Sequence, residues 1–420
     1  MRHKSNKHIQ QSYAPVQPFT DEYQSSLKAI LSAAALITIT GGMQVAWITG
    51  FSSVNAGVYN TDVCIAWCLT AIGGTWLSAM ISKRVPFPII LQVSAVLVLL
   101  SGTVATLCRF NMMALLATRC LNGLANGLVF GPMLGVVGES QTVGHKRDFL
   151  ACIVEQGAWI LGISLQFICG ASWRGNNTLS ADQLQSVLSA ICGGVALILA
   201  SSKDMKNQPR PANPGKLVYN EQHDLLEALP ALLRICLLRI LCALSYCSVL
   251  ALRITSDGDF GLSTMPYVLC GLARLIGNCS AGSVLDSTGR KFPLLLGLVM
   301  SGCLAFGVAS VSKIHIAQCL LLTYQFFAGM SFAPTSAYLS EVFLQSVKQF
   351  CIALIHIAEL TVQVLFIWLV QANDIEKSSV FNSFYILGGL TIVVIVMSIS
   401  FMPETKGTAQ PETKGSSEHS

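Results

Sequence analysis

The stretch STGRKFPLLLG at residues 287–297 resembles the stretch SKRVPFPIILQ at residues 82–92, since both place a basic pair just before an apolar run. A second pair of similar stretches lies further along, GESQTVGHKR at residues 138–147 and SEVFLQSVK at residues 340–348. In both pairs the second copy comes about 200 residues after the first. This constant offset predicts that one structural unit occurs twice in the same orientation.

The composition indicates that lipid surrounds most of the chain. Of its 420 residues, 53% are hydrophobic and only 11% are charged, whereas an average soluble domain has about 25% charged residues. The net charge of +5 is spread over many connectors without a basic tract, which argues against a nucleic-acid partner. The 15 cysteines lie almost entirely in apolar runs without a CxxC pair, so neither a disulfide framework nor a metal site is expected.

Twelve apolar segments are long enough to cross a membrane as helices, which requires about 20 mostly apolar residues. Their approximate cores are residues 28–51, 63–82, 87–108, 112–138, 149–171, 183–200, 235–254, 262–284, 293–312, 314–339, 350–371 and 380–402. The predicted fold class is therefore an all-α membrane protein with twelve transmembrane helices in two six-helix halves.

The longest inner connector contains Pro209, Pro211 and Pro214 and divides the helices six and six. We expect five regions: an N-terminal tail at 1–26, a first half at 27–200, a linker at 201–233, a second half at 234–402 and a C-terminal tail at 403–420.

The distribution of basic residues predicts the orientation. With both termini cytoplasmic, 17 lysines and arginines fall on the inner side and five on the outer side, as the positive-inside rule requires. The same orientation places Asn176 outside, in an Asn-Asn-Thr glycosylation sequon that a cell either uses or leaves unmodified. Residues 1–26 contain no apolar segment, so the first helix is expected to act as the membrane signal, with the plasma membrane as the expected location.

Several motifs in the inner connectors resemble those of sugar porters in the major facilitator superfamily. DSTGRKFPLLLG matches their D-x-x-G-R-[RK]-x-L loop, YLSEVF at residues 338–343 matches Y-x-S-E-[IVL]-F, and PETKG at residues 403–407 matches the ending after the last helix. The motif residues of the fourth helix and its loop are Arg119, Gly123, Gly127, Glu139 and Arg147. Among sugar porters, the second-helix stretch DVCIAWCLTAIGGTWLSAM is most similar to insect facilitated trehalose transporters, through Trp67. The resemblance implies a substrate site near the membrane midplane, between the halves.

The chain also departs from this family pattern. The paired glutamines of the seventh helix are missing, because the aligned stretch reads Cys242-Ala243-Leu244-Ser245-Tyr246. Ser336 stands in the tenth helix where the family has a tryptophan, and Asp148 replaces the glycine after Arg147.

Candidate substrate-binding residues are polar groups on apolar helices, since a sugar is recognised by amides, hydroxyls and an aromatic face. They are Gln156, Gln166, Ser245, Ser336, Glu359 and Gln363. His356 and Gln363 lie three residues before and four residues after Glu359, which places all three on one helix face. Hydrogen bonding between helices remains an alternative role for the glutamines.

Four ionisable residues, Arg119, Glu155, Arg274 and Glu359, lie at membrane depth, where charge is costly and usually functional. An ionised Glu359 is expected to accept from substrate hydroxyls or to pair with a cation such as Arg119 or Arg274. If desolvation keeps it protonated, it would donate to substrate instead.

The charged residues at the inner helix ends form a candidate gate. They are Glu139, Arg147, Asp286, Arg290, Lys291, Glu341 and Lys348. Paired between the halves they would hold the inner side closed; the alternative is that they only satisfy the positive-inside rule.

The leading functional hypothesis is a facilitative carrier that moves a sugar or sugar-like polyol by alternating access. Two alternatives stay open: a transport-dead relative that serves as a nutrient sensor or scaffold, and a carrier of a different small organic solute. No nucleophile, metal-spacing or phosphate-loop motif occurs in the loops, so neither an enzyme activity nor a cofactor is expected. The expected partners are the solute and the lipid bilayer, and the oligomeric state is left open.

Overall fold

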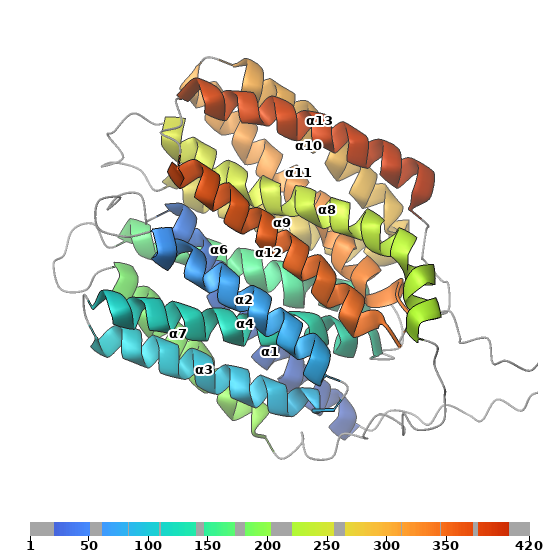
Figure 1. Ribbon diagram of the computed structural model, residues 1–420. Helices are drawn as coiled ribbons and strands as arrows, with labels where there is room; N and C mark the ends of the chain where they lie inside the picture. The colour runs from blue at the N-terminus through green and yellow to red at the C-terminus, as the bar shows by residue number, and fades with distance from the viewer. Residues whose placement is uncertain are drawn as a thin grey trace, which may run out of the picture.

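The protein is an all-helical bundle (Figure 1). The computed structural model describes residues 21–50, 61–82, 84–108, 111–139, 147–172, 181–202, 221–255, 265–311, 313–344, 346–372 and 377–402. The helices are α1 (Asp21–Gly50), α2 (Thr61–Ile81), α3 (Phe87–Leu107), α4 (Met112–Glu139), α5 (Arg147–Cys152), η1 (Ile153–Gly157), α6 (Ala158–Ser172), α7 (Ala181–Ala200), α8 (Glu221–Thr255), α9 (Met265–Thr288), α10 (Lys291–Ser310), α11 (Ile314–Glu341), α12 (Lys348–Ala372) and α13 (Lys377–Phe401). The predicted glycosylation site Asn176 and both PETKG copies lie outside the described residues.

The predicted number of membrane-spanning helices is confirmed for the described part of the chain. Eleven segments are long and apolar enough to cross a membrane, and the twelfth span is α2, whose described apolar part is Ile65–Ile81. The elements α5, η1 and α6 follow one another without a break and together make a single span, Asp148–Cys169.

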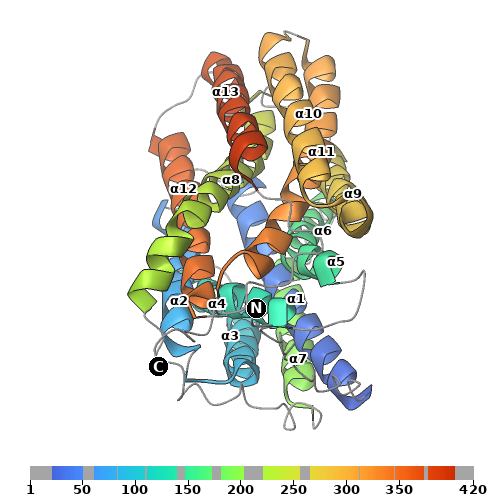
Figure 2. The ribbon, with the colours of Figure 1, turned by 90° about the vertical axis from the view of Figure 1, so that its right-hand side faces the viewer.

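The helices form two groups, α1 to α7 in one part of the bundle and α8 to α13 in the other (Figure 1). The groups meet where α2 lies beside α12 and where α6 lies beside α9 (Figure 2). These groups correspond to the two predicted halves.

Equivalent close contacts occur in both halves, as expected for a repeated unit. Gly123 of α4 lies against the backbone carbonyl of Trp67 in α2, and Gly329 of α11 lies against the carbonyl of Arg274 in α9. A Cβ atom at either glycine would overlap that oxygen. Arg274 follows Trp67 by 207 residues and Gly329 follows Gly123 by 206. Small residues at these crossings let helix backbones approach, which is how helices associate in lipid.

The outer helices present apolar side chains to the surroundings, while polar side chains are buried inside the bundle. Leu100 of α3, Ile198 of α7, Val299 of α10 and Val393 of α13 are all exposed. A surface of this kind fits hydrocarbon rather than water.

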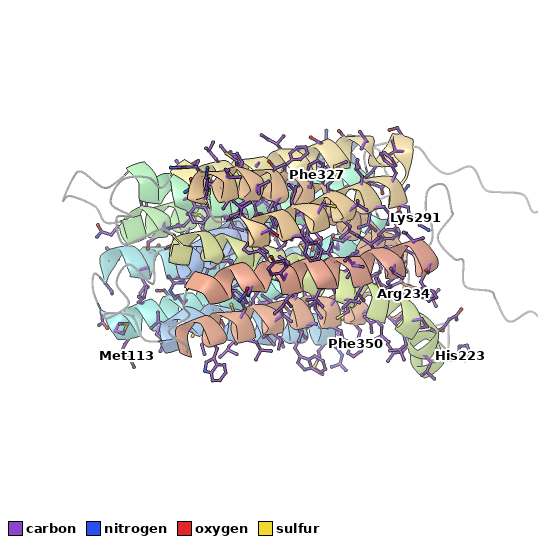
Figure 3. The ribbon with its side chains drawn as sticks, turned by 90° about the horizontal axis from the view of Figure 1, so that it is seen from above. Met113, His223, Arg234, Lys291, Phe327 and Phe350 are labelled. Atoms are coloured by element: carbon purple, nitrogen blue, oxygen red, sulfur yellow. The ribbon has the colours of Figure 1, made fainter. Side chains whose placement is uncertain are left out.

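Figure 3 distinguishes the two ends of the bundle. Lys291, Arg234 and His223 lie at one end, and Met113 lies at the opposite end. We call the first the Arg290 end; α4, α9 and α11 finish there and α5, α10 and α12 begin there.

The main difference from the predicted boundaries concerns α8, which begins at Glu221 rather than near residue 235. The first turns mix charged residues such as Asp224 and Glu227 with leucines, so a search for continuous apolar segments misses them. The predicted linker at 201–233 therefore ends about a dozen residues too late, and α8 continues well before the apolar segment.

Candidate functional site

A cavity lies where the two halves meet, with about 350 Å³ of space that no atom occupies, which includes the open solvent at its mouth. Each half contributes five of the residues that line it. They are Thr38, Phe130, Glu155, Gln156 and Trp159 from the first half, and Arg239, His356, Glu359, Leu360 and Gln363 from the second. Three of the six predicted substrate-binding residues, Gln156, Glu359 and Gln363, are among them.

The centre of this cavity is a cluster of four ionisable side chains, Arg239, Glu155, Glu359 and His356. Arg239 Nη2 donates to Glu155 Oε1 at 2.5 Å and to Glu359 Oε2 at 2.8 Å. Arg239 Nε also donates to Glu359 Oε2 at 3.1 Å. His356 lies between the carboxylates, with Nε2 3.6 Å from Glu155 Oε1 and Nδ1 3.6 Å from Glu359 Oε2. Because Glu155 belongs to the first half and the other three to the second, the cluster connects the halves.

The cluster is almost completely removed from solvent, with Arg239 2% exposed and Glu155 4% exposed. Removing Arg239 would leave the buried carboxylates of Glu155 and Glu359 without their cation, which is costly. Thr335 helps to hold the guanidinium, since its hydroxyl oxygen accepts from Arg239 Nη1 at 3.2 Å. Arg239 is therefore fixed from three helices at once: η1, α11 and α12.

Not every polar atom in the cavity is satisfied. Glu155 Oε2, Gln363 Oε1 and His356 Nε2 are buried without a hydrogen-bond partner in the described part of the protein. Gln363 Oε1 can only accept hydrogen bonds, and so can Glu155 Oε2 while that carboxylate is ionised. The open positions in this cavity therefore suit a ligand that donates.

An aromatic wall completes the cavity on the side of the first half. The ring of Trp159 lies 5.6 Å from that of Phe130 and 5.7 Å from that of Trp67. Phe130 in turn lies 5.6 Å from the ring of His356. Trp67 donates from Nε1 to Asn122 Oδ1 at 3.2 Å, and this hydrogen bond holds its ring against Trp159.

A short π-helix, η1, carries Glu155 and Gln156. A π-helix accommodates one more residue per turn than the regular pattern allows and is frequent at functional sites. Here it brings two adjacent polar side chains to the same cavity.

The partner of Glu359 is Arg239, so the expected pairing with Arg119 or Arg274 is wrong. Arg119 instead donates to Gln44 Oε1 at 2.7 Å. Arg274 donates to Gln325 Oε1 at 3.0 Å and to Ser245 Oγ at 2.9 Å. Neither arginine lines the cavity between the halves.

Arg239 was overlooked because a helix starting near residue 235 places it at the membrane surface, where a cation is unremarkable. With α8 beginning at Glu221, Arg239 lies more than four turns into the helix and reaches the centre of the bundle. The sequence did indicate a buried position for Arg239, because it is surrounded by apolar residues in the stretch RICLLRILCAL at residues 234–244.

The remaining predicted substrate-binding residues lie elsewhere. Ser245 belongs to the hydrogen-bond network of Arg274. Gln166 and Ser336 are fully buried and do not line the cavity. A second cavity, next to Arg119, is lined by residues of α1, α3, α4 and α7. It therefore lies inside the first half and not at the junction of the halves.

An ion pair joins the two halves at the Arg290 end. Arg290 Nη2 lies 2.5 Å from Asp148 Oδ2 in the first half and 2.8 Å from Glu341 Oε1 in the second. All three side chains are buried. Asp148 is the residue that replaces the glycine of the family motif, so this departure supplies the partner across the halves. Gly289, with a φ of 84°, makes the turn that directs Arg290 inward.

The other predicted gate residues have different surroundings. The buried Lys348 lies with the backbone of Ser340 against Gly138 of α4, which is a further contact between the halves. Lys291 donates to the backbone carbonyl of Ile399 at 2.9 Å, inside the second half. The side chains of Glu139, Arg147 and Asp286 lie outside the described part of the structure.

Among the described residues, no three His, Cys, Asp or Glu side chains are arranged to hold a metal ion.

Comparison with solved structures identifies the fold. The chain is similar to the proton:xylose symporter XylE bound to 6-bromo-6-deoxy-D-glucose, with a TM-score of 0.73 and 16% identity over 93% of this chain and 98% of that chain. It is also similar to the partially occluded inward-open xylose transporter XylE from E. coli, with a TM-score of 0.70 and 17% identity over 93% and 100% of the two chains. The chain thus has the fold of these solved structures, and the eleven apolar segments of its described part identify a multi-pass integral membrane protein.

One family model matches part of the chain. Residues 222–413, which make up the second half of the chain, match the model described as "Sugar (and other) transporter". No curated protein sequence matches the chain.

Proposed function

We propose that the protein is a member of the sugar transporter family that moves a sugar or sugar-like polyol across the membrane by alternating access. The observation that carries this proposal is the cavity at the junction of the halves, to which both halves contribute equally. A solute bound there would contact both halves, so rocking of one half against the other would expose it to either side of the membrane.

The ion pair at the Arg290 end supports such a motion. Asp148 and Arg290 hold the halves together at that end, and Glu341 remains as a partner for Arg290 in the same half. Arg290 would therefore stay compensated when the halves separate. This arrangement lowers the cost of opening, as a carrier requires when its two states differ by only a few kcal/mol.

We further propose that transport is facilitative. Residues 25–46 of α1 contain no acidic residue, and the hydrogen-bond acceptor for Arg119 on this helix is the neutral amide of Gln44. A carboxylate at that place could take up and release protons, which an amide cannot do. Proton linkage would then depend on the central cluster of Glu155, Glu359 and His356.

A second candidate function is that of a solute sensor that binds without transporting. It is favoured by the buried Glu155–Arg239 pair, which joins the halves at the cavity itself, and by Cys242 and Ala243, which stand at the positions of the family's paired amides.

Uptake by the purified full-length protein in liposomes tests the proposal. Radiolabelled sugars and polyols would be supplied with and without an imposed pH gradient, and protein-free liposomes serve as the control. Saturable uptake that does not need the gradient is expected. Binding of a solute without any uptake would favour the sensor, and uptake only with the gradient would contradict the facilitative mode.

We also propose that both termini are cytoplasmic, as the distribution of basic residues predicts. The Arg290 end would then face the cytoplasm. Epitope tags at the termini should be reached by antibody only after the cells are permeabilised. Labelling of tags on intact cells would show that the orientation is the opposite of the proposed one.

A further inference from the structure

The central cavity contains more negative than positive charge. Arg239 contributes one positive charge, while Glu155 and Glu359 contribute two negative charges, so the sum is −1 when His356 is neutral. No other charged side chain lines the cavity within the described part of the protein. A buried site with an uncompensated charge is unfavourable unless a counter-charge joins it.

The hydrogen-bonding atoms that remain unpaired in the cavity also favour a positively charged donor. The guanidinium of Arg239 already donates to Glu155, Glu359 and Thr335. The buried atoms without a hydrogen-bond partner include Glu155 Oε2 and Gln363 Oε1, which both accept. A solute in this cavity therefore meets acceptors and a net negative charge.

The aromatic wall formed by Trp159 and Phe130 is compatible with a positively charged solute. Trp159 and Phe130 line the cavity together with the carboxylates. Aromatic faces attract cations and also pack against the carbon face of a sugar ring. The cavity thus combines a surface for a ring with a site for positive charge.

We propose that the transported solute carries one positive charge beside its hydroxyl groups, which makes it an amino sugar or an amino polyol. This proposal rests on the proposed function and specifies the substrate class of the same cavity. The protonated amine would donate to Glu155 Oε2 and bring the cavity to neutrality, while the hydroxyl groups would use Gln156 and Gln363. The missing pair of amides in α8 is consistent with a substrate that is recognised through charge.

The test measures uptake by the purified full-length protein in liposomes. Radiolabelled glucosamine is compared with glucose and with N-acetylglucosamine, in which the ring is kept and the charge is removed. Sorbitol and its 1-amino derivative form a second matched pair. We expect the amine of each set to be preferred by about tenfold or more, the usual effect of one charge-assisted hydrogen bond.

Glu155→Gln should lower the ratio of amine to neutral-sugar affinity by about tenfold, because it removes one negative charge and keeps the side-chain shape. The control is Glu227→Gln, the same change at an exposed position of α8 outside the cavity. If Glu155→Gln does not yield folded protein, Glu359→Gln removes the same charge from the opposite wall and must lower the same ratio.

The outcomes separate this inference from the proposed function. Uptake of neutral sugars without preference for the amine, or a preference that survives both glutamine variants, would overturn the inference and leave the proposed function in place. Absence of all uptake would overturn the proposed function. Thermal melting of the detergent-purified protein then decides the inference: stabilisation by glucosamine but not by N-acetylglucosamine supports it, and any other pattern overturns it.

Discussion

The ion pair between Asp148 and Arg290 should control how often the Arg290 end opens. We expect Asp148→Asn to shift the protein toward the state that is open at this end, because the variant loses the charge that holds the halves together. A hydrogen bond between charged groups contributes about 1.5–3 kcal/mol. Both side chains are buried, so solvent screens the pair little.

The free energy that Asp148→Asn removes from the closed state lies toward the lower part of that range, because Glu341 still compensates Arg290 after the substitution. A loss of about 2 kcal/mol corresponds to a roughly thirtyfold change in the ratio of open to closed molecules. Asp224→Asn is the matched control: Asp224 accepts from Ser346 Oγ at 2.7 Å, and that contact lies inside the second half.

Single-molecule energy transfer can measure this ratio in lipid nanodiscs. Dyes attached through noncanonical amino acids at Ser201 and Ser287 would report the separation of the halves, since both positions are exposed and lie at the Arg290 end. Asp148→Asn should increase the low-transfer population and Asp224→Asn should leave it unchanged. Identical distributions for wild type and Asp148→Asn would refute the reasoning, and the charges at this end would then only satisfy the positive-inside rule.

Two further predictions concern the interior of the bundle. Arg239→Gln should destabilise the protein by about 3–5 kcal/mol in thermal melting, because it leaves Glu155 and Glu359 buried without their cation; a melting temperature equal to that of wild type would show that the carboxylates are neutral. Gly329→Val should reduce the yield of folded protein, because a Cβ there overlaps the carbonyl of Arg274, whereas Gly389→Val is the control at a glycine with nothing within 4 Å.

The sequence was sufficient for the architecture because the relevant signals are long and repeated. Twelve apolar segments, with two copies of the same inner connectors, predict two six-helix halves without any knowledge of side-chain contacts. The polar face of α12 was also predictable, because His356, Glu359 and Gln363 follow helical spacing in an otherwise apolar stretch. All three residues line the cavity.

The partners of the charged residues could not be predicted in the same way. Arg239 and Glu359 are 120 residues apart, and their pairing depends on where α8 begins and how the two helices are rotated. Asp148 was noted only as a departure from a glycine motif, whereas its contact with Arg290 depends on how closely the halves approach. The π-helix around Glu155 is set by packing and has no marker in the sequence comparable to a proline or a glycine.

We expect the protein to carry a solute through alternating exposure of the cavity between its halves. Entrance counterflow in liposomes tests it most directly: vesicles loaded with excess unlabelled solute are diluted into a trace of the labelled form. A facilitative carrier should accumulate label transiently above the outside concentration, because outgoing unlabelled solute returns the cavity to the outside for the next labelled molecule. Binding of the solute without any transient accumulation would contradict the account and identify the protein as a sensor.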